Sequence, residues 1–170
     1  LFKSWGFDMK PGMVIGDIVN GRKVSLGPSN DQKIVTYVLW LAIQQNLLSN
    51  TDIITSNLDY IFLKSAGSIE NLNTNSSLVI EPLIRTSKES MLIERYKMQF
   101  RADPEQLLKD FESQDKSYII GARIKGELDS AFTTEDIKKI ELDTKQHRNN
   151  VKDANIILFA DTDLLSDNTW

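Results

Sequence analysis

The feature of the sequence that most constrains the fold is a short, continuous apolar run close to the end of the chain. Residues 156–160 read IILFA, with charged residues before them and Asp161-Thr162-Asp163 directly after them. A run this short, rich in β-branched and aromatic residues and bounded by turn formers, is typical of a strand buried on both faces. Such strands belong to parallel or mixed sheets that helices cover, so the run predicts an α/β fold.

The length of the chain and its first residues bear on its domain organisation. With 170 residues, the chain is long enough for one domain with a substantial core and too short for two. We therefore predict a single soluble domain over residues 1–170. The chain starts at Leu1, without a Met or a signal peptide, and residues 1–5 followed by Gly6 are typical of the last turn of a helix and its C-cap. We interpret the chain as a fragment of a larger protein.

Charge and cysteine content exclude several classes of function. The formal net charge is -4 at pH 7 and the sequence has no block of Lys and Arg, which argues against a nucleic-acid-binding surface. The chain has no Cys, so disulfides, thiolate metal sites and a Cys nucleophile are excluded. No apolar stretch approaches the roughly 18 residues that a membrane-spanning helix needs.

Short apolar runs predict several further strands. They lie at residues 13–17, 34–43, 60–63, 78–84, 91–93 and 118–124, and a second strand follows a bend at residues 126–132. Pro82 lacks a backbone N–H, which confines the strand at residues 78–84 to a sheet edge or a bulge. Asn20-Gly21 fits a type I′ hairpin turn between residues 13–17 and 22–26, although a helical turn over residues 17–24 fits nearly as well.

Two segments predict helices. Asp103-Pro104-Glu105 is the clearest helix start in the chain, because Asp103 can cap, Pro104 suits the first helical position and Glu105 complements the positive end of the helix. Residues 133–150 are strongly charged and carry few aliphatic side chains. This segment is typical of a solvated helix or of a loop that packs weakly.

Asp161 and Asp163 are the sharpest local signal for chemistry. In α/β folds, ligands gather beyond the carboxyl ends of the strands, where these carboxylates are expected to lie. They could hold Mg²⁺ or act as nucleophile and acid/base, as in haloacid-dehalogenase-type phosphotransferases. Those enzymes place a Thr or Val four residues after the first Asp, where this chain has Leu165, and carry the motif near the N-terminus. We therefore favour the alternative that one of the two caps the turn beginning at Leu164.

Other polar groups give weaker signals. The turn from Ser65 to Ser68 can offer backbone N–H groups to an anion, although a plain turn is the better interpretation. His147 is the one histidine and lies in a charged segment, so we expect an exposed surface side chain rather than a member of a triad or a metal cluster. The sequence yields no catalytic constellation, and we predict that the chain is not an enzyme and needs no metal or cofactor.

Four stretches match a known family in their order and approximate spacing. They are Ser65-Ala66-Gly67 followed by Ile69-Glu70, Asp103-Pro104 leading into residues 107–111 (LLKDF), Ala122-Arg123-Ile124-Lys125-Gly126 with Ser130-Ala131-Phe132, and residues 160–167 (ADTDLLSD) after the apolar run. In these stretches the chain resembles the GldG family, the auxiliary component of ABC-type transport systems linked to gliding motility. The resemblance extends from Trp5-Gly6 to the end of the chain.

This resemblance implies a bacterial, membrane-anchored protein whose large soluble region lies outside the cytoplasmic membrane, in the periplasm. The chain would be the middle to C-terminal part of that region, and its partners would be an ABC transporter permease and its ATPase. The implied fold is Rossmann-like α/β, with a mixed, mostly parallel sheet flanked by helices. It is similar to class I glutamine amidotransferases without their Cys-based triad. The family offers no catalytic residues to carry over.

The function expected from these observations is that of a non-catalytic extracytoplasmic auxiliary component with a binding or scaffolding role. One alternative is a small-molecule or glycan-binding domain, with a pocket between the loops of Ser65 and Ser68 and of Asp161 and Asp163. A concave pocket lined by Tyr60 or Trp40 would favour that alternative, whereas a flat apolar patch would favour protein contact. The other is a metal-dependent phosphotransferase that uses the two aspartates.

Overall fold

The strands of this protein pair in the antiparallel sense. The computed structural model describes residues 2–72, 77–98, 103–140 and 147–165, and every strand pair in these ranges is antiparallel. The predicted Rossmann-like fold with a mixed, mostly parallel sheet is therefore wrong. The described α-helices, α1 (Pro104–Lys109) and α2 (Thr134–Lys139), have six residues each. Because the described ranges contain no parallel pair, neither helix connects two parallel strands.

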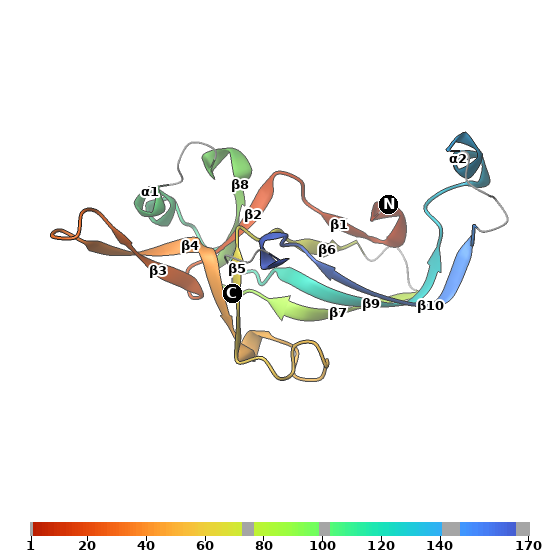
Figure 1. The fold of residues 1–170 in the computed structure, drawn as a ribbon, viewed down its shortest axis with the longest axis horizontal. Helices are drawn as coiled ribbons and strands as arrows, with labels where there is room; N and C mark the ends of the chain where they lie inside the picture. Colours follow the sequence, from red (N-terminus) through yellow and green to blue (C-terminus); the bar gives the residue numbers. More distant parts are fainter. Residues whose placement is uncertain (1, 73–76, 99–102, 141–146, 166–170) are drawn as a thin grey trace.

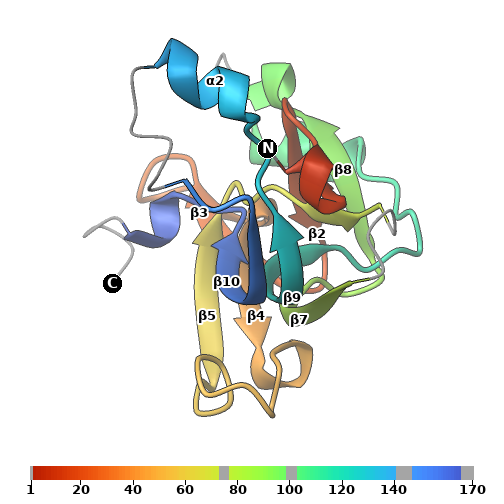
Figure 2. The same cartoon turned by 90° about the vertical axis from the view of Figure 1, so that its right-hand side faces the viewer.

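The largest sheet has five strands around a long central strand. Its members are β1 (Phe7–Met9), β6 (Ile69–Asn71), β7 (Leu78–Arg85), β9 (Ile119–Asp129) and β10 (Asn150–Phe159). One path runs β1-β6-β9-β10, and β7 also pairs with β9. Figure 2 shows β9 between β10 and β7. The central strand thus joins the two halves of the sequence in one sheet.

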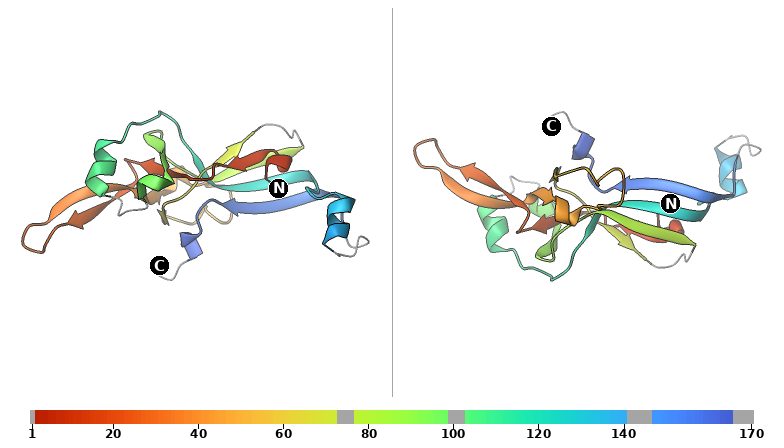
Figure 3. Two further views of the ribbon diagram at one scale, coloured as in Figure 1. Left: turned by 90° about the horizontal axis from the view of Figure 1, so that it is seen from above. Right: turned by 90° about the horizontal axis from the view of Figure 1, so that it is seen from below.

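Two smaller units complete the fold. One is a three-stranded sheet of β3 (Gly21–Leu26), β4 (Lys33–Gln44) and β5 (Tyr60–Lys64), and the other is a ladder of β2 (Met13–Asp17) with β8 (Ser90–Glu94). In Figure 1 the hairpin of β3 and β4 extends at one end of the molecule, and α2 lies at the other. The views from above and below in Figure 3 show the same elongated shape.

The apolar run at residues 156–160 does contribute to a strand, but not to a doubly buried one. Residues 156–159 end β10, which pairs with β9 alone among the described strands. Ile157 is 38% exposed, and Leu158 and Phe159 are half-buried. The β-branched composition predicted the strand correctly. Burial on both faces requires a covering layer on each side of the sheet, and the exposure of Ile157 shows that one face of β10 is partly open to solvent.

Several local predictions can be compared with the strand register. The hairpin predicted at Asn20-Gly21 is wrong, because β2 pairs with β8 while β3 pairs with β4. The register of β7 against β9 shifts between Pro82 and Ile84, which confirms the predicted irregularity at the proline. The separate strand predicted at residues 126–132 is also wrong, since β9 continues without a break through Gly126 to Asp129.

The helix start predicted at Asp103 is confirmed by its cap. Asp103 accepts a hydrogen bond from the backbone N–H of Glu105 at 3.0 Å, and Pro104 takes the first position of α1. The charged segment begins with α2, where Thr133 and Asp136 form a capping box. Residues 141–146 of that segment lie outside the described residues. Near the start of the chain, residues 3–5 form a single 3₁₀ turn that Gly6 ends with a φ of 86°, as the sequence predicted.

The main core lies where the three sheets meet. Its largest fully buried side chains come from all three units: Ile15 from the β2–β8 ladder, Leu41, Ile43 and Leu63 from the three-stranded sheet, and Leu83, Ile84 and Ile120 from the large sheet. Burying one such side chain contributes about 1.5–3 kcal/mol.

Among the described residues, no helix has the length and the hydropathy that crossing a membrane requires.

An ion pair ties the loop after β4 to the large sheet. Arg123 of β9 donates from Nε and Nη2 to the two carboxylate oxygens of Asp52, at 2.5 and 2.9 Å, and from Nη1 to Asn155 of β10 at 2.8 Å. The side chains of Arg123 and Asp52 are 12% and 9% exposed. The hydrogen bonds from Arg123, followed by that from the backbone of Ile54, lower the pKa of Asp52 to about 2.

This ion pair predicts a specific dependence of stability on pH. The pKa of Asp52 is lower in the folded chain than in the unfolded chain, where an Asp titrates near about 3.9. Its stabilising contribution is therefore complete above the unfolded pKa and is lost as pH falls toward the folded pKa. We expect Asp52→Asn to lower the free energy of unfolding at pH 7, and the difference from the unmodified chain to shrink between about pH 5 and pH 2. Urea denaturation at a series of pH values measures this difference, and a constant difference would contradict the prediction.

Candidate functional site

The two loops that the sequence singled out lie side by side. The backbone N–H of Gly67 donates to the carbonyl of Ala160 at 2.7 Å, and the backbone N–H of Lys64 donates to Oδ2 of Asp161 at 3.1 Å. Ser65 lies between these two donors and has a φ of 54°, in the left-handed region. The structure therefore brings the loop of Ser65 and Ser68 next to that of Asp161 and Asp163, although the sheet that positions them is not the predicted one.

Asp161 uses both carboxylate oxygens for the backbone. Besides the bond from Lys64, its Oδ1 accepts from the N–H groups of Asp163 at 2.7 Å and Leu164 at 3.3 Å, which begin the 3₁₀ turn η4 (Asp163–Leu165). Burial raises the pKa of Asp161, and these hydrogen bonds oppose the rise. The capping role that we favoured is confirmed for Asp161. Asp163 is exposed, and the described residues contain no group of three or more His, Asp or Glu placed to hold a metal ion.

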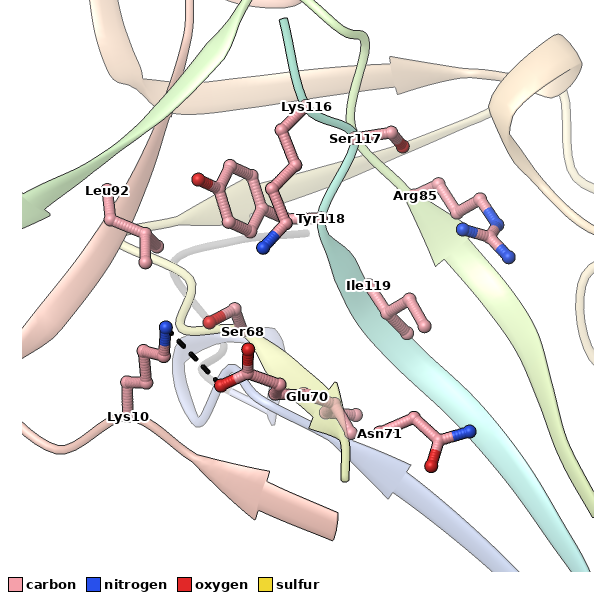
Figure 4. Close-up of a pocket in the computed structure, with 11 residues that line it drawn as sticks. Lys10, Ser68, Glu70, Asn71, Arg85, Leu92, Lys116, Ser117, Tyr118 and Ile119 are labelled. Atoms are coloured by element: carbon pink, nitrogen blue, oxygen red, sulfur yellow. Dashed lines mark ion pairs between the residues drawn. The ribbon is translucent and has the colours of Figure 1, made fainter. Parts of the chain in front are cut away.

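Ser68 leads from these loops into a cleft of about 220 Å³. The charged and polar side chains that matter for its chemistry are Lys10, Ser68, Glu70, Arg85, Lys116 and Tyr118. They come from the turn after β1, from β6 and the residue before it, from the end of β7 and from the segment that enters β9. Figure 4 shows Lys10, Glu70 and Ser68 on one side of this segment, with Lys116 and Tyr118 above them and Arg85 across from them. Four separate parts of the chain thus contribute these polar side chains, and Leu92 of β8 adds an apolar one.

The electrostatics of the cleft are dominated by positive charge. Lys10 Nζ lies 3.3 Å from Glu70 Oε2, and Lys116 Nζ lies 5.1 Å from the centre of the Tyr118 ring. Burial raises the pKa of Tyr118; Lys10 lowers it and Glu70 raises it by smaller amounts. The phenol therefore stays neutral at pH 7, where it donates a hydrogen bond to Gln114 Oε1.

The segment that carries Lys116 and Tyr118 is held by a polar network beneath the cleft. Lys116 N donates to the carbonyl of Lys88 at 3.0 Å, Ser117 Oγ to the carbonyl of Thr86 at 2.7 Å, and Tyr118 N to Oγ1 of Thr86 at 2.8 Å. Thr86 is fully buried. These bonds fix the backbone of the segment, so the points from which its side chains extend along the cleft wall are set before any ligand arrives.

Asp17 anchors the same network. Its side chain is fully buried at the end of β2 and accepts five hydrogen bonds, from the N–H of Val19, from the N–H and the side-chain amide of Asn20, and from the N–H and the hydroxyl of Ser87, at 2.8–3.1 Å. Ser90 Oγ donates to Thr86 Oγ1 at 2.8 Å and thereby joins β8 to the network. The sequence did not single out Asp17, because nothing in its neighbours distinguishes a buried Asp from a turn former.

A second feature is the outer face of the three-stranded sheet. Trp40 lies 5.3 Å from Tyr37 and 6.3 Å from Phe62, ring centre to ring centre. Arg22 lies over the ring of Phe62 at 4.7 Å, and Lys64 lies within 5.6 Å of the rings of both Trp40 and Phe62. We call these five residues with Tyr60 the aromatic face. A shallow hollow of about 270 Å³ opens on it beside Tyr60, Arg22 and Gln44.

Comparison with known protein families identifies the family of this chain. The sequence model of the family described as ABC-type uncharacterized transport system matches residues 1–170. The chain belongs to this ABC transport auxiliary family. No curated protein and no solved structure matches it.

Membership of the ABC transport auxiliary family confirms the coarser part of the resemblance drawn from the sequence. The auxiliary component carries two of the quoted stretches in its described site, Ser65-Ala66-Gly67 and the residues that follow Ala160. Ser166 and Asp167 of that last stretch lie outside the described residues. The cleft of the auxiliary component was not predicted, because Lys10, Arg85 and Lys116 share no spacing or motif in the sequence.

His147 of the auxiliary component differs from its predicted environment. Its side chain is half-buried rather than exposed, and its Nε2 is buried without a hydrogen-bond partner among the described residues. The charged neighbours in the sequence suggested full exposure. They gave no information about the conformation of residues 147–149, which lead into β10.

The capping role of Asp161 in the auxiliary component gives a second prediction. Asp161→Ala leaves three backbone N–H groups without their acceptor, and we expect it to lower the free energy of unfolding by about 1–2 kcal/mol. Asp163→Ala is the matched control, because Asp163 is exposed at a nearby position, and we expect it to change the stability by no more than about 0.5 kcal/mol. Urea denaturation of both variants measures the effect. Equal losses would show that the cap contributes nothing specific.

Proposed function

We propose that this chain is a non-catalytic, extracytoplasmic component of its ABC transport system and acts by docking onto a protein subunit of the transporter. The observation that carries the proposal is the aromatic face. Tryptophan, tyrosine, phenylalanine and arginine are the residue types most enriched at the centres of protein interfaces. On the aromatic face these types lie together on one solvent-facing side of a sheet, with Tyr60 62% and Trp40 37% exposed.

The hollow beside Tyr60 is a feature expected of the small-molecule or glycan alternative, but the arrangement of the rings and cations favours a protein partner. A sugar ring stacks on the open face of an aromatic side chain, whereas Arg22 and Lys64 lie over the rings of Phe62 and Trp40. A partner that carries carboxylates can instead bind the two cations from outside and pack against the edges of the rings. The occupant that fits is therefore an acidic protein surface.

Membership of an ABC transport auxiliary family supports a partner within the transport system. We propose that the partner is the permease, through a carboxylate-bearing segment outside the membrane, and that the ATPase is reached only through the permease. In this proposal the chain is part of a GldG-type, membrane-anchored protein with its soluble region in the periplasm. The phosphotransferase alternative is not favoured, because both carboxylate oxygens of Asp161 accept hydrogen bonds from the backbone.

The proposal is tested in the complete transport system. We expect the tagged full-length protein to co-purify with the permease from detergent-solubilised membranes, and Tyr60→Ala or Arg22→Gln to reduce the recovered permease by about tenfold. Tyr96→Ala is the matched control, because Tyr96 is equally exposed at 62% and lies outside the aromatic face. Full recovery of the permease with the Tyr60 and Arg22 variants would overturn the proposal, as would an equal loss with the Tyr96 variant.

A further inference from the structure

The cleft beside Ser68 concentrates positive charge on an acidic chain. Lys10, Arg85 and Lys116 line the cleft with a single carboxylate, that of Glu70, whereas the whole chain has a formal net charge of -4. Like charges around one hollow repel each other, and an anion bound between them removes that repulsion. The cleft is therefore electrostatically complementary to a negatively charged ligand.

The one carboxylate of the cleft does not neutralise all three cations. Glu70 pairs with Lys10, as the dashed line in Figure 4 shows. Lys116 lies over the Tyr118 ring and forms no ion pair with a described residue, and no hydrogen bond or ion pair joins the side chain of Arg85 to a described residue. Two cations thus remain available to a ligand.

The size of the cleft limits what that ligand can be. Its volume of about 220 Å³ is below the range of about 300–1,000 Å³ that is usual for sites of drug-sized ligands. The walls include the hydroxyl of Ser68 and the aromatic ring of Tyr118, whereas the hydroxyl of Ser117 already donates to the carbonyl of Thr86. A small organic anion has the right size, and its polar groups meet the cations and the hydroxyl of Ser68.

Hydrogen bonds fix the backbone at Arg85 and Lys116, the two available cations of the cleft. Arg85 ends β7 directly before the buried Thr86, and Lys116 is fixed through its backbone to Lys88. Because the backbone at both positions is set by hydrogen bonds, a ligand has to order only the ends of two side chains, which lowers the entropic cost of binding.

We propose that the cleft binds a small organic dianion, with carboxylate or phosphate groups as the recognised chemistry. The guanidinium of Arg85 is suited to hold one anionic group with two parallel hydrogen bonds, and the ammonium group of Lys116 holds the second. This role is independent of the docking proposed for the aromatic face, since the two features share no residue.

Isothermal titration calorimetry on the chain tests the proposal with four probes. Succinate and citrate present carboxylates, and inorganic phosphate and glycerol 3-phosphate present a phosphate group. We expect saturable binding at one site for at least one probe, and comparison of the two pairs identifies which anionic group the cleft recognises. If none of the four binds saturably, the proposal is overturned.

Three charge-neutralising variants separate a built site from general attraction between charges. Arg85→Gln and Lys116→Gln are expected to weaken binding by about tenfold each. Glu70→Gln is expected to tighten it by a few-fold, because it removes the one repelling carboxylate and releases Lys10. Lys23→Gln, at an exposed lysine of β3, should leave the affinity unchanged. An equal loss with Lys23→Gln, or weaker binding with Glu70→Gln, would contradict the proposal.

Discussion

Replacing Asp17 with alanine is expected to lower the free energy of unfolding by about 3 kcal/mol or more. The carboxylate is fully buried and accepts five hydrogen bonds, so the substitution leaves the buried donors of Asn20 and the partly buried donors of Ser87 without their acceptor. Denaturation in urea, followed by circular dichroism, gives the difference. We expect the midpoint to fall without a large change in the slope.

Two further variants test whether hydrogen bonding is the cause. Asp17→Asn keeps the volume but replaces an acceptor by a donor that faces other donors, so we expect it to lose most of the same stability. Asp31→Ala removes an exposed carboxylate and should change the stability by less than about 0.5 kcal/mol. If Asp17→Asn were as stable as the unmodified chain, the five hydrogen bonds would not be the source of the stability.

Replacing Gly126 with alanine is expected to cost at least about 2 kcal/mol. Gly126 has a φ of +129°, which side chains rarely adopt, and an added Cβ would lie 2.0 Å from the carbonyl oxygen of Ser77. The clash involves backbone atoms, so it is relieved only if the start of β7 moves away from β9, where Leu78 pairs with Gly126. Thermal and urea unfolding both measure the loss.

Gly12→Ala is the matched control for the clash. Gly12 also has a positive φ, of +77°, but nothing lies within 4 Å of the position of an added Cβ. Its substitution therefore includes the backbone strain without the contact, and we expect a cost of about 1 kcal/mol. Equal costs at the two positions would show that the contact with Ser77 contributes nothing.

Local features of this fold could be predicted from the sequence because they depend on neighbouring residues. The cap of α1 requires only Asp103 and Pro104 at adjacent positions, and the irregularity of β7 requires only the missing N–H of Pro82. Short apolar runs likewise predicted most of the strands. In each case the chemistry that decides the structure lies within a few residues.

The pairing of the strands could not be predicted in the same way. The run at residues 156–160 is compatible with a parallel central strand and with an antiparallel strand that has one neighbour, and the structure has the second. Pairing depends on contacts between segments that are distant in the sequence, such as those of Ile69 with Ile119 and of Leu78 with Gly126 in β9. The composition of a single segment carries no information about these contacts.

In the candidate sites, too, features that depend on neighbouring residues could be predicted, and features that depend on distant residues could not. The loops of Ser65 and Asp161 were placed together only in the small-molecule-binding alternative, and the structure brings them into contact. The cap at Asp161 follows from its place before a turn. The cleft brings together Lys10, Arg85 and Lys116, which are far apart in the sequence. Single cations on the surface are common, and only the three-dimensional arrangement distinguishes these three from the rest.

The position of Thr86 has a consequence for how the molecule opens. Its hydroxyl accepts hydrogen bonds from Ser90 of β8 and from the backbone of Tyr118, at the entrance to β9. The hydroxyl oxygen of Thr86 therefore links the β2–β8 ladder to the large sheet. The two units cannot move apart without breaking at least one of these two hydrogen bonds. In native-state hydrogen exchange we expect the amides of Leu92 and Tyr118 to exchange with the same opening free energy, as members of one cooperative unit.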